Sequence, residues 1–456
     1  MNPDLLNKII KAYDIRGLVD KELTPDFTFA AGAAFARFLE SEREPATVVI
    51  GEDMRPSSPE LADAFADGVT SQGMDVIRIG LASTDQLYFA AGKLNMPGAM
   101  FTASHNPAAY NGIKLCKSGA RPIGQETGLT WIRNAIEAGS PISNRPVGKE
   151  SRREMLTDYV DFLYSLFDHD FSGRRLRIAV DAGNGMAGHT APAVLARMNA
   201  EVFPLYFELD GSFPNHEANP IAPENLVDLQ KLVKKKKADI GLAFDGDADR
   251  CFLVDENGDL VNPSALTALI ADRALASDPG STIIYNLISS RSVKEVVEEN
   301  GGTAVRSRVG HSYIKKLMAE TGAIFGGEHS GHFYFRDFWR ADSGMLAALH
   351  ALAALSESSG TFSQLLKSYN RYSSSGEINS VVSDSQSVMA AIESFYQAVD
   401  GITTDHLDGL TVESQDWWFN VRASNTEPLL RLNVEANNQR LMEKVRTQVL
   451  ALIGGK

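Results

Sequence analysis

The sequence predicts an α/β protein with three related α/β blocks followed by one α+β unit. Short apolar runs alternate with helical stretches through most of the chain, which is the pattern of repeated strand–helix units. The pattern restarts three times with strands and helices of similar length, and it changes near the C-terminus to several strands and one closing helix. At 456 residues the chain is too long for a single core, so several domains are expected.

The expected strands can be assigned block by block. The first block has them at 47–51, 75–79, 98–102 and 113–116, with a helix at 59–73; the second at 175–181, 200–207, 240–244 and 251–255; the third at 281–287, 303–310 and 323–327. The final unit has strands at 409–414, 417–424 and 429–436 and a helix at 439–453, and the segment GEINSVVSDSQS (376–387) is expected to be a linker. The predicted domains are 1–153, 154–255, 256–370 and 371–456.

Composition and charge exclude several classes of partner. The net charge of −14 argues against nucleic acid or an anionic membrane, and the one lysine run (234–237) is expected to be the solvated end of a helix. No apolar run is long enough to span a membrane, and the N-terminus has no secretory signal pattern. Two distant cysteines, Cys116 and Cys251, suit the reducing cytoplasm as buried, unpaired residues. The sequence carries no signal for an oligomeric state.

The strongest motif is FDGDADR, where Asp245, Asp247 and Asp249 follow the apolar strand IGLAF. In extended backbone, alternate side chains point to the same side, so the three carboxylates are expected to converge and to hold a cation. Oxygen ligands favour Mg²⁺ or Ca²⁺ over zinc. An EF-hand loop is excluded because Arg250 stands where the sharp turn needs glycine, and the flanks are strand-like.

The segment TASHNP contains Ser104 between Thr102 and His105. It has two readings: a polar turn before Pro107, or a reactive hydroxyl placed near a metal ion. Lys114 follows a few residues later, so adjacent strands are expected to join the serine loop to this lysine.

Further polar segments supply candidate binding groups. KAYDIRG places Arg16 around a turn that ends at Gly17, and SRVGHSYIK supplies Arg308 and His311. GEHSGH carries Glu328, His329, Ser330 and His332 on a glycine-rich loop, which suits recognition of sugar hydroxyls better than zinc binding on a helix. VRASNTEP combines Arg422 with hydroxyl and amide side chains, as an anion cradle does, although a polar hairpin is the alternative.

Taken together, KAYDIRG, TASHNP, DGDADR, GEHSGH and RASNTEP resemble the α-D-phosphohexomutase family, in the family's order and over the whole chain. The resemblance implies four domains around a central cleft, three α/β and one C-terminal α+β. It implies reversible transfer of a phosphoryl group between the 1- and 6-positions of a hexose phosphate, through a hexose 1,6-bisphosphate.

The resemblance also implies residue roles. Ser104 would be a phosphoserine in the resting enzyme, and Mg²⁺ would be held by Ser104 together with Asp245, Asp247 and Asp249. Arg16, His105 and Lys114 would lie near the transferring phosphoryl group, and the proton-transfer group stays open between Lys114 and His332. The substrate would be bound by a larger set: Arg250, Arg308, His311, Glu328, Ser330, Arg422, Ser424, Asn425, Thr426 and Arg431.

One departure bears on the substrate. His329 stands where phosphomannomutases commonly carry Met and glucosamine-specific relatives commonly carry Gln, while Thr102 at the start of the serine loop favours a hexose over a hexosamine. Mannose and glucose phosphates are therefore the expected substrates, with phosphoglucosamine mutase as the alternative. A metal-dependent phosphatase and a non-catalytic sugar-phosphate binder are two further alternatives.

Overall fold

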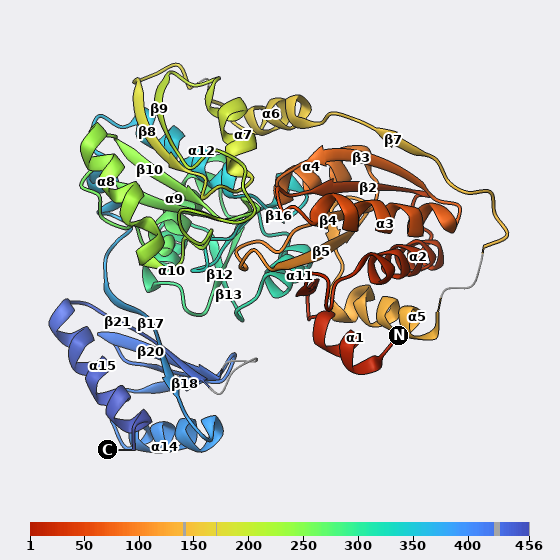
Figure 1. Cartoon of the computed structure of the whole chain (residues 1–456). Coiled ribbons are helices and arrows are strands. Elements are labelled where there is room, and N and C mark those ends of the chain that lie inside the picture. The colour runs from red at the N-terminus through yellow and green to blue at the C-terminus, as the bar shows by residue number, and fades with distance from the viewer. Residues whose placement is uncertain (140–142, 170, 424–428, 456) are drawn as a thin grey trace. The chain divides into compact units, whose positions relative to one another are not determined.

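The computed structural model describes residues 1–139, 143–169, 171–423 and 429–455. The chain forms two compact units, the first of residues Met1–Val261 and Ser330–Leu365 and the second of Asn262–His329 and Leu366–Lys456 (Figure 1). Among the described residues, no helix has both the length and the apolar character that crossing a membrane requires.

The N-terminal block is built on a seven-stranded sheet. Its strand order is β1-β5-β4-β2-β3-β7, with β6 paired to β5. The bounds are β1 (Ile15–Leu18), β2 (Thr47–Glu52), β3 (Asp75–Leu81), β4 (Gly98–Phe101), β5 (Tyr110–Lys117), β6 (Arg121–Pro122) and β7 (Glu150–Arg152). β2 runs parallel to β3 and β4, whereas β5 is antiparallel to both β4 and β1. The turn expected at 11–17 is wrong in part, because Arg16 and Gly17 lie within β1 and pair with β5.

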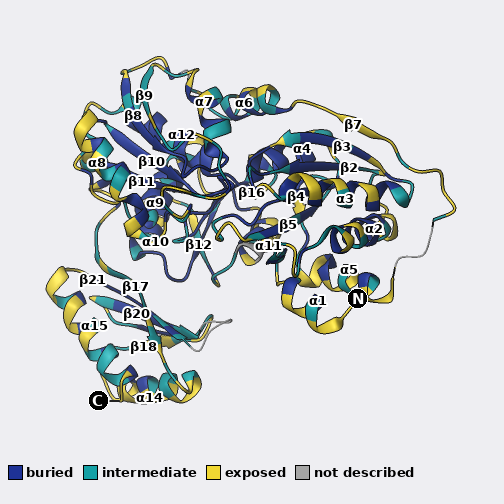
Figure 2. Cartoon of the chain, in the orientation of Figure 1, coloured by how far each residue is buried: buried dark blue, intermediate teal, exposed yellow. Residues whose placement is uncertain are grey.

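Helices cover both faces of this sheet. They are α1 (Pro3–Ile9), α2 (Pro25–Ser41), α3 (Ser58–Ser71), α4 (Thr84–Leu94), the π-turn η1 (Gln125–Leu129) and α5 (Thr130–Ala138). Because side chains alternate along a strand, Val48 and Ile50 of β2 join the core beneath α2 and α3. The position of Gly98 in β4 faces Leu87 and Ala91 of α4 on the other side. Figure 2 shows the strands between these helices as buried.

The helices α2 and α3 approach so closely that only glycine fits at their crossing. A Cβ at Gly32 would lie 2.1 Å from the carbonyl oxygen of Phe65, and a Cβ at Gly68 would lie 2.1 Å from that of Phe29. Both distances are far below van der Waals contact, so the two glycines set the spacing of the helices.

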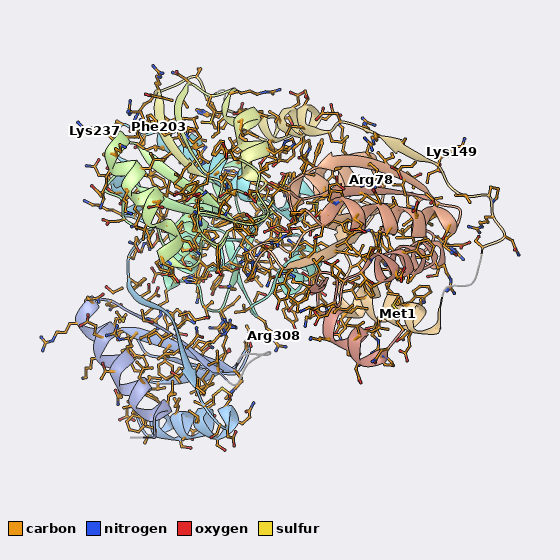
Figure 3. All side chains as sticks on the ribbon, in the orientation of Figure 1. Met1, Arg78, Lys149, Phe203, Lys237 and Arg308 are labelled. Carbon is orange, nitrogen blue, oxygen red and sulfur yellow. The ribbon has the colours of Figure 1, made fainter. Side chains whose placement is uncertain are left out.

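The second block has a four-stranded sheet of order β11-β10-β8-β9. Its elements are α6 (Leu156–Ser165), β8 (Leu176–Asp181), α7 (Ala187–Leu195), β9 (Ala200–Leu205), η2 (Pro223–Leu226), α8 (Val227–Lys236), β10 (Ile240–Phe244) and β11 (Cys251–Asp255). β10 and β11 are antiparallel neighbours, which confirms strand flanks for the acidic loop and the exclusion of an EF-hand. The lysine run ends α8 as expected. Figure 3 labels Lys237, which caps this helix, and Phe203 of β9.

The first unit is completed by residues 330–365. They form β15 (Phe333–Phe335), η3 (Arg336–Phe338), β16 (Ala341–Asp342) and α12 (Gly344–Glu357). β15 and β16 are antiparallel, and Ser343 caps α12 by accepting a hydrogen bond from the backbone N–H of Leu346 at 3.0 Å. The start of α12 follows β16 directly, so Asp342 of β16 and the cap residue Ser343 are neighbours.

The second unit contains a parallel strand group and an antiparallel sheet. The first group has α9 (Pro263–Ser277), β12 (Thr282–Asn286), α10 (Arg291–Glu299), β13 (Thr303–Ser307), α11 (His311–Thr321) and β14 (Phe325–Gly327), with β12 parallel to both other strands. After α13 (Phe362–Leu366), the C-terminal sheet has the order β17-β21-β20-β19-β18. It comprises β17 (Ser373–Val381), α14 (Ser385–Gln397), β18 (Thr403–Asp405), β19 (Leu410–Glu413), β20 (Trp417–Ala423), β21 (Leu429–Ala436) and α15 (Gln439–Ile453).

The predicted linker at 376–387 is wrong. Residues 377–381 pair with β21 as part of β17, and α14 begins at Ser385. The exposed and partly buried positions alternate along β17, as in an edge strand with one solvated face. The polar composition of the segment therefore concealed a strand.

Candidate active site

The serine loop connects β4 to β5, and its backbone holds Ser104 in a left-handed conformation with φ 50°. Ser104 is 2% exposed, and its N–H donates to the hydroxyl of Thr102 at 2.9 Å. The Oγ of Ser104 donates to Oδ2 of Asp245 at 2.7 Å and lies 3.3 Å from Nδ1 of His105. The hydroxyl is thus aimed at the acidic loop. The charge of Arg250, followed by burial and Arg16, holds the pKa of His105 well below its ordinary value.

A buried arginine that the sequence analysis missed fixes the shape of this loop. Arg55 is 1% exposed, and its two terminal nitrogens donate to four backbone carbonyls, those of Ser104 (3.0 Å), Asn106 (2.7 Å), Pro107 (3.0 Å) and Tyr110 (2.9 Å). Its Nε pairs with Asp53 at 3.2 Å. The planar guanidinium suits this task because its donors point in fixed directions. The available signal was an arginine in GEDMRPSS, directly after β2.

The three aspartates of the acidic loop converge, as predicted. Asp245, Asp247 and Asp249 are at most 1% exposed, and one carboxylate oxygen from each lies within 4.8 Å of the others. The predicted backbone is wrong, however, because the segment is a turn in which Ala248 has φ 59° and its N–H bonds to the carbonyl of Asp245 at 3.0 Å. A tight turn therefore gathers carboxylates that an extended strand would space more widely.

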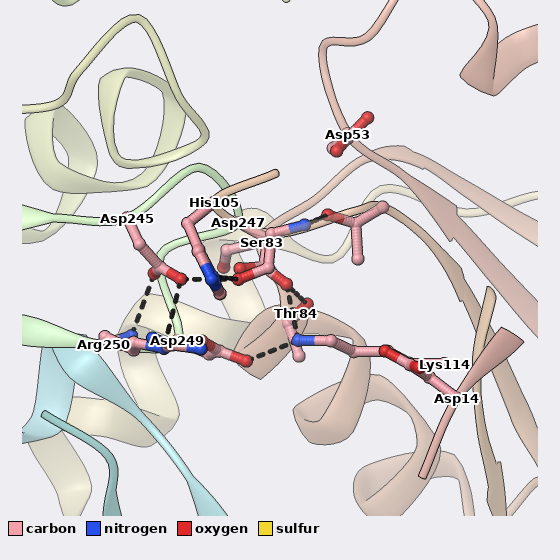
Figure 4. A network of polar contacts seen from close by, with 12 residues as sticks. Asp14, Asp53, Ser83, Thr84, His105, Lys114, Asp245, Asp247, Asp249 and Arg250 are labelled. Carbon is pink, nitrogen blue, oxygen red and sulfur yellow. Dashed lines mark hydrogen bonds and ion pairs between the residues drawn. The ribbon is translucent and has the colours of Figure 1, made fainter. Parts of the chain in front are cut away.

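Lys114 joins the serine hairpin to the acidic loop (Figure 4). Its Nζ lies 2.7 Å from Oδ2 of Asp247 and 2.6 Å from Oδ2 of Asp249. Lys114 pairs with Met100 across β5 and β4, which confirms that adjacent strands connect the lysine to the loop. Burial lowers the pKa of Lys114, but Asp247 and Asp249 outweigh it, and the net pKa is raised well above its ordinary value.

The carboxylate group fits a divalent cation. Oδ1 of Asp247 and Oδ1 of Asp249 are buried and have no hydrogen-bond partner within the described part of the chain. Burial, followed by the charges of Asp249 and Asp247, raises the pKa of Asp245 well above its usual range. Carboxylate oxygens that are crowded in a buried site and lack hydrogen bonds to the described residues are the hard ligands that Mg²⁺ prefers. The predicted metal ligands therefore have the right chemistry for Mg²⁺.

Thr84, at the start of α4, supports Asp247 and was also missed. Its Oγ1 donates to Oδ2 of Asp247 at 2.6 Å, and its N–H donates to the backbone carbonyl of Asp247 at 2.9 Å. These contacts join residues 163 positions apart, so no local sequence pattern could have indicated them.

Three more predicted residues lie around this centre. Arg250 reaches Oδ2 of Asp245 at 3.5 Å through its Nε. His332 contacts Oδ2 of Asp342 at 2.9 Å through Nδ1, which also lies 3.8 Å from Oδ1 of Asp249. Arg16 contacts Asn106 of the serine loop and pairs with Asp14 at 2.5 Å. The first unit thus gathers the serine, the lysine, the aspartates, two arginines and His332.

The predicted residues of the second unit form local groups of their own. Glu328 is 2% exposed and accepts the N–H of Gly310 at 3.1 Å. The guanidinium of Arg308 lies 5.2 Å from the ring centre of Tyr313. The side chain of His311 lies outside the described part of the chain. Ser330, which belongs to the first unit, is partly buried.

Arg422 and Arg431 lie opposite each other on β20 and β21. Both pair with Glu377, at 2.8 Å and 3.5 Å. The Nε atoms of both arginines are buried and have no hydrogen-bond partner among the described residues. Ser424, Asn425 and Thr426 lie outside the described residues. The unpaired donors on two adjacent cations are consistent with an anion site next to that segment.

Family models match all four parts of the chain. Residues 7–142, 157–258 and 262–372 match alpha/beta/alpha domains I, II and III of phosphoglucomutase/phosphomannomutase, and residues 377–452 match its C-terminal domain. The chain is 38% identical over 449 residues to phosphomannomutase of Escherichia coli strain K12, covering 96% of this chain and 97% of that protein. It is 36% identical over 453 residues to phosphoglucomutase of Neisseria gonorrhoeae, covering 98% and 96%.

A solved structure agrees with these matches. A phosphoglucomutase/phosphomannomutase family protein from Burkholderia thailandensis superimposes with a TM-score of 0.89 at 30% identity, covering 100% of this chain and 98% of that chain. Fold and relatives together define the class: the protein is a phosphohexose mutase with three α/β domains and a C-terminal α+β domain. Within that class, the chain belongs to the phosphoglucomutase/phosphomannomutase family.

Proposed function

We propose that this phosphohexose mutase interconverts the 1- and 6-phosphates of hexoses, with Ser104 as the residue that carries the phosphoryl group. The main support is the position of the Ser104 hydroxyl, 2.7 Å from Asp245 in a group of three buried carboxylates, with Lys114 bound to the other two. A serine without an activating base is a poor nucleophile. A phosphorylated serine needs no such activation, because it starts as the donor.

Asp245, Asp247 and Asp249 would hold Mg²⁺ beside Ser104. When bound, Mg²⁺ supplies positive charge to the oxygens of the transferring phosphoryl group. Lys114 and Arg250 contribute fixed positive charges to the same place, which stabilise the charge that develops during transfer. Arg16 and His105 contribute through the serine loop, which Arg16 contacts at Asn106.

In each half-reaction one P–O bond breaks and another forms. The phosphoryl group leaves Oγ of Ser104 for the free hydroxyl of a hexose monophosphate, which gives a hexose 1,6-bisphosphate and an unmodified serine. The sugar hydroxyl's proton passes to a group of the protein, and Oγ of Ser104 takes up a proton as its bond to phosphorus breaks. After the bisphosphate has turned over, the other phosphoryl group moves to Oγ, Ser104 gives up its proton, and the sugar oxygen that is released takes up a proton.

His332 is the better-placed group for this proton. Its Nδ1 is held by Asp342 at 2.9 Å, so the imidazole has a fixed orientation beside the acidic loop. A carboxylate behind a histidine sets the tautomer and stabilises the imidazolium that forms when the ring accepts a proton. Lys114 remains the alternative.

The remaining predicted residues would bind the sugar and its second phosphate. Glu328 and Ser330 would contact hydroxyls, with Arg308 and His311 beside the ring. Arg422 and Arg431 would bind the phosphate that is not transferred, together with the segment at 424–426. Support for the last role comes from the buried Nε atoms of both arginines, which have no hydrogen-bond partner among the residues that the structure describes.

The expected substrates are mannose and glucose phosphates. The bound sugar must present first one end and then the other to Ser104, and a half-turn of the ring roughly exchanges C3 and C4 while moving C2 elsewhere. A site that cannot hydrogen-bond the C2 hydroxyl in both poses gains little discrimination at that carbon, which is where mannose and glucose differ. Phosphoglucosamine mutase is the alternative.

Incubation with mannose, glucose and glucosamine 1-phosphates tests the proposal. Isomerised 6-phosphate supports it, whereas free phosphate alone indicates a phosphatase and no product indicates a binding protein. Intact-mass analysis of the wild type should show a phosphorylated species, whereas Ser104→Ala should lack it and should be nearly inactive. Ser277→Ala, at an exposed helix position, is the matched control. Full activity of Ser104→Ala would contradict the assigned role.

Three lesser proposals accompany this one. The domain limits after 153, 255 and 370 stay predictions, as does a cleft among the domains. A cytoplasmic location is supported by Cys116 and Cys251, which are both buried and form no disulfide within the described residues. The partner is a hexose phosphate, and the net charge of −14 argues against nucleic acid.

A further inference from the structure

Asp85, at the start of α4, is a buried acid that the proposed reaction does not use. It is 1% exposed. Its Oδ2 accepts hydrogen bonds from Tyr159 Oη at 2.7 Å and Ser343 Oγ at 2.6 Å, and its Oδ1 accepts one from Ser83. These hydroxyls come from α6, from the cap of α12 and from the cap of α4. One carboxylate therefore ties together three helices that are far apart in the sequence.

The residues next to this junction contact the active site on two sides. Thr84, which precedes Asp85, donates to Asp247 through both its N–H and its hydroxyl. Asp342, which precedes Ser343, holds Nδ1 of His332 at 2.9 Å. Thr84 is the direct neighbour of Asp85, and Asp342 is the direct neighbour of Ser343. A shift at the junction would therefore move the contacts to the acidic loop and to His332.

The buried carboxylate of Asp85 destabilises the fold unless its hydrogen-bond donors are all present. Burying a carboxylate without partners is unfavourable, and the three hydroxyl donors offset that cost. Burial raises the pKa of Asp85 to about 6, while the hydroxyls of Ser343, Ser83 and Tyr159 oppose this increase. A shorter side chain would leave three buried hydroxyls with no common acceptor, and their rotamers would no longer be fixed.

We propose that Asp85 is a positioning residue for phosphoryl transfer: it fixes the first turns of α4 and α12 relative to each other, so that Thr84 sets Asp247 and Asp342 sets His332. The inference rests on the proposed function of the acidic loop and His332. It assigns Asp85 no contact with substrate or metal.

The test compares Asp85→Ala and Asp85→Asn with Asp272→Ala. Asp272 likewise accepts a tyrosine hydroxyl, from Tyr369 at 2.5 Å, but it has no hydrogen bond or ion pair to a described residue of the proposed site. Mg²⁺ affinity is measured by calorimetry without substrate, and kcat and KM are measured separately. Urea unfolding gives the folded fraction of each variant.

Asp85→Ala should weaken Mg²⁺ binding at least threefold and lower kcat about tenfold or more, because small misplacements of reacting groups are costly, while KM changes little. Asp85→Asn keeps an acceptor oxygen for Tyr159 and Ser343, so it should recover most of both losses. Asp272→Ala should change neither quantity.

Native Mg²⁺ affinity and native kcat in Asp85→Ala would overturn the proposal, as would losses fully explained by the unfolded fraction. If Asp85→Ala does not fold, Ser343→Ala gives the same readouts with one donor removed, and unchanged values there also count against it. Because Mg²⁺ affinity is measured without turnover, this result is independent of whether the mutase assay succeeds.

Discussion

Replacing Arg55 with lysine should loosen the serine loop without unfolding the protein. The guanidinium donates to four carbonyls within seven residues of chain, from Ser104 to Tyr110. An ammonium has one nitrogen, which cannot lie within hydrogen-bond distance of all four oxygens in the same directions. At least two carbonyls would lose their donor.

The magnitude follows from those two lost bonds. A hydrogen bond from a charged donor contributes about 1.5–3 kcal/mol, so the loss of two in Arg55→Lys should lower the free energy of unfolding by about 3–6 kcal/mol. Domains are typically stable by about 5–15 kcal/mol, which exceeds this loss over most of the range, so the variant should remain folded. Because all four carbonyls belong to the segment from Ser104 to Tyr110, the serine loop should loosen and the activity should fall further than the folded fraction.

Urea unfolding and steady-state kinetics measure these effects, and hydrogen exchange over residues 102–110 reports on the loop. The matched control is Arg174→Lys, at an arginine that is a third exposed and donates to the Gly360 carbonyl at 2.8 Å. We expect a loss below about 1 kcal/mol there. If Arg55→Lys unfolds like the control and exchanges like the wild type, Arg55 does not hold the loop.

Three other predictions concern packing, pH and specificity. Gly32→Ala places a Cβ 2.1 Å from the Phe65 carbonyl and should cost about 1–3 kcal/mol in thermal or urea unfolding, whereas Gly173→Ala, with its nearest neighbour at 3.5 Å, should cost little; equal losses would refute this. Burial lowers the pKa of His216, but Asp181 outweighs it and the net pKa is raised. Its contribution to stability is therefore fully present below the unfolded pKa of about 6.5 and is lost as the pH rises through the folded pKa; His216→Gln should flatten this part of the stability profile, and an unchanged slope would contradict it. For mannose and glucose 1-phosphates, kcat/KM should agree within about 10–100-fold, and a preference above about a thousandfold would show that C2 is read directly.

The sequence predicted the parts of the site that follow from local order along the chain. The apolar strand before Ser104 and the strand that contains Lys114 are neighbours, so the hairpin joins the serine loop to the lysine as expected. The aspartates converge through a turn rather than an extended strand, because Ala248 adopts a left-handed conformation. This conformation is usual for glycine or asparagine, so an alanine at this position gave no sign of it. The spacing of the motif thus indicated that the carboxylates converge, but not the backbone conformation that brings them together.

What the sequence did not predict is carried by long-range contacts. Thr84 and Arg55 meet the site through residues 163 and 49 positions away, and neither stands in a distinctive local pattern. The segment at 376–387 was mistaken for a linker because an edge strand with a solvated face is polar, and its pairing with β21 depends on a strand about 50 residues later in the chain. Buried polar contacts between distant elements can be identified only from the folded structure.

The last prediction concerns charge balance at the centre. When ionised, Asp245, Asp247 and Asp249 carry three negative charges, against one positive charge each on Lys114 and Arg250. A divalent cation alone would make this group net positive, by about one charge, and a phosphoserine with a charge of about −1.5 to −2 would make it net negative, which favours binding of the cation. Two unit charges about 4 Å apart interact by about 4 kcal/mol at an effective dielectric constant near 20, and a third of that energy is a tenfold change in Kd.

Mg²⁺ should therefore bind at least about tenfold more tightly when Ser104 is phosphorylated. Calorimetric titration of the phosphorylated and the phosphatase-treated protein measures the difference, and Ser104→Ala should behave like the treated form. Since Oδ1 of Asp247 and Oδ1 of Asp249 have no hydrogen-bond partner among the described residues, the cation can use them while Lys114 keeps its contacts to the Oδ2 atoms. Equal Kd values in the two forms would mean that the cation does not sense the charge on Ser104, and the assignment of these carboxylates to the transfer step would fail.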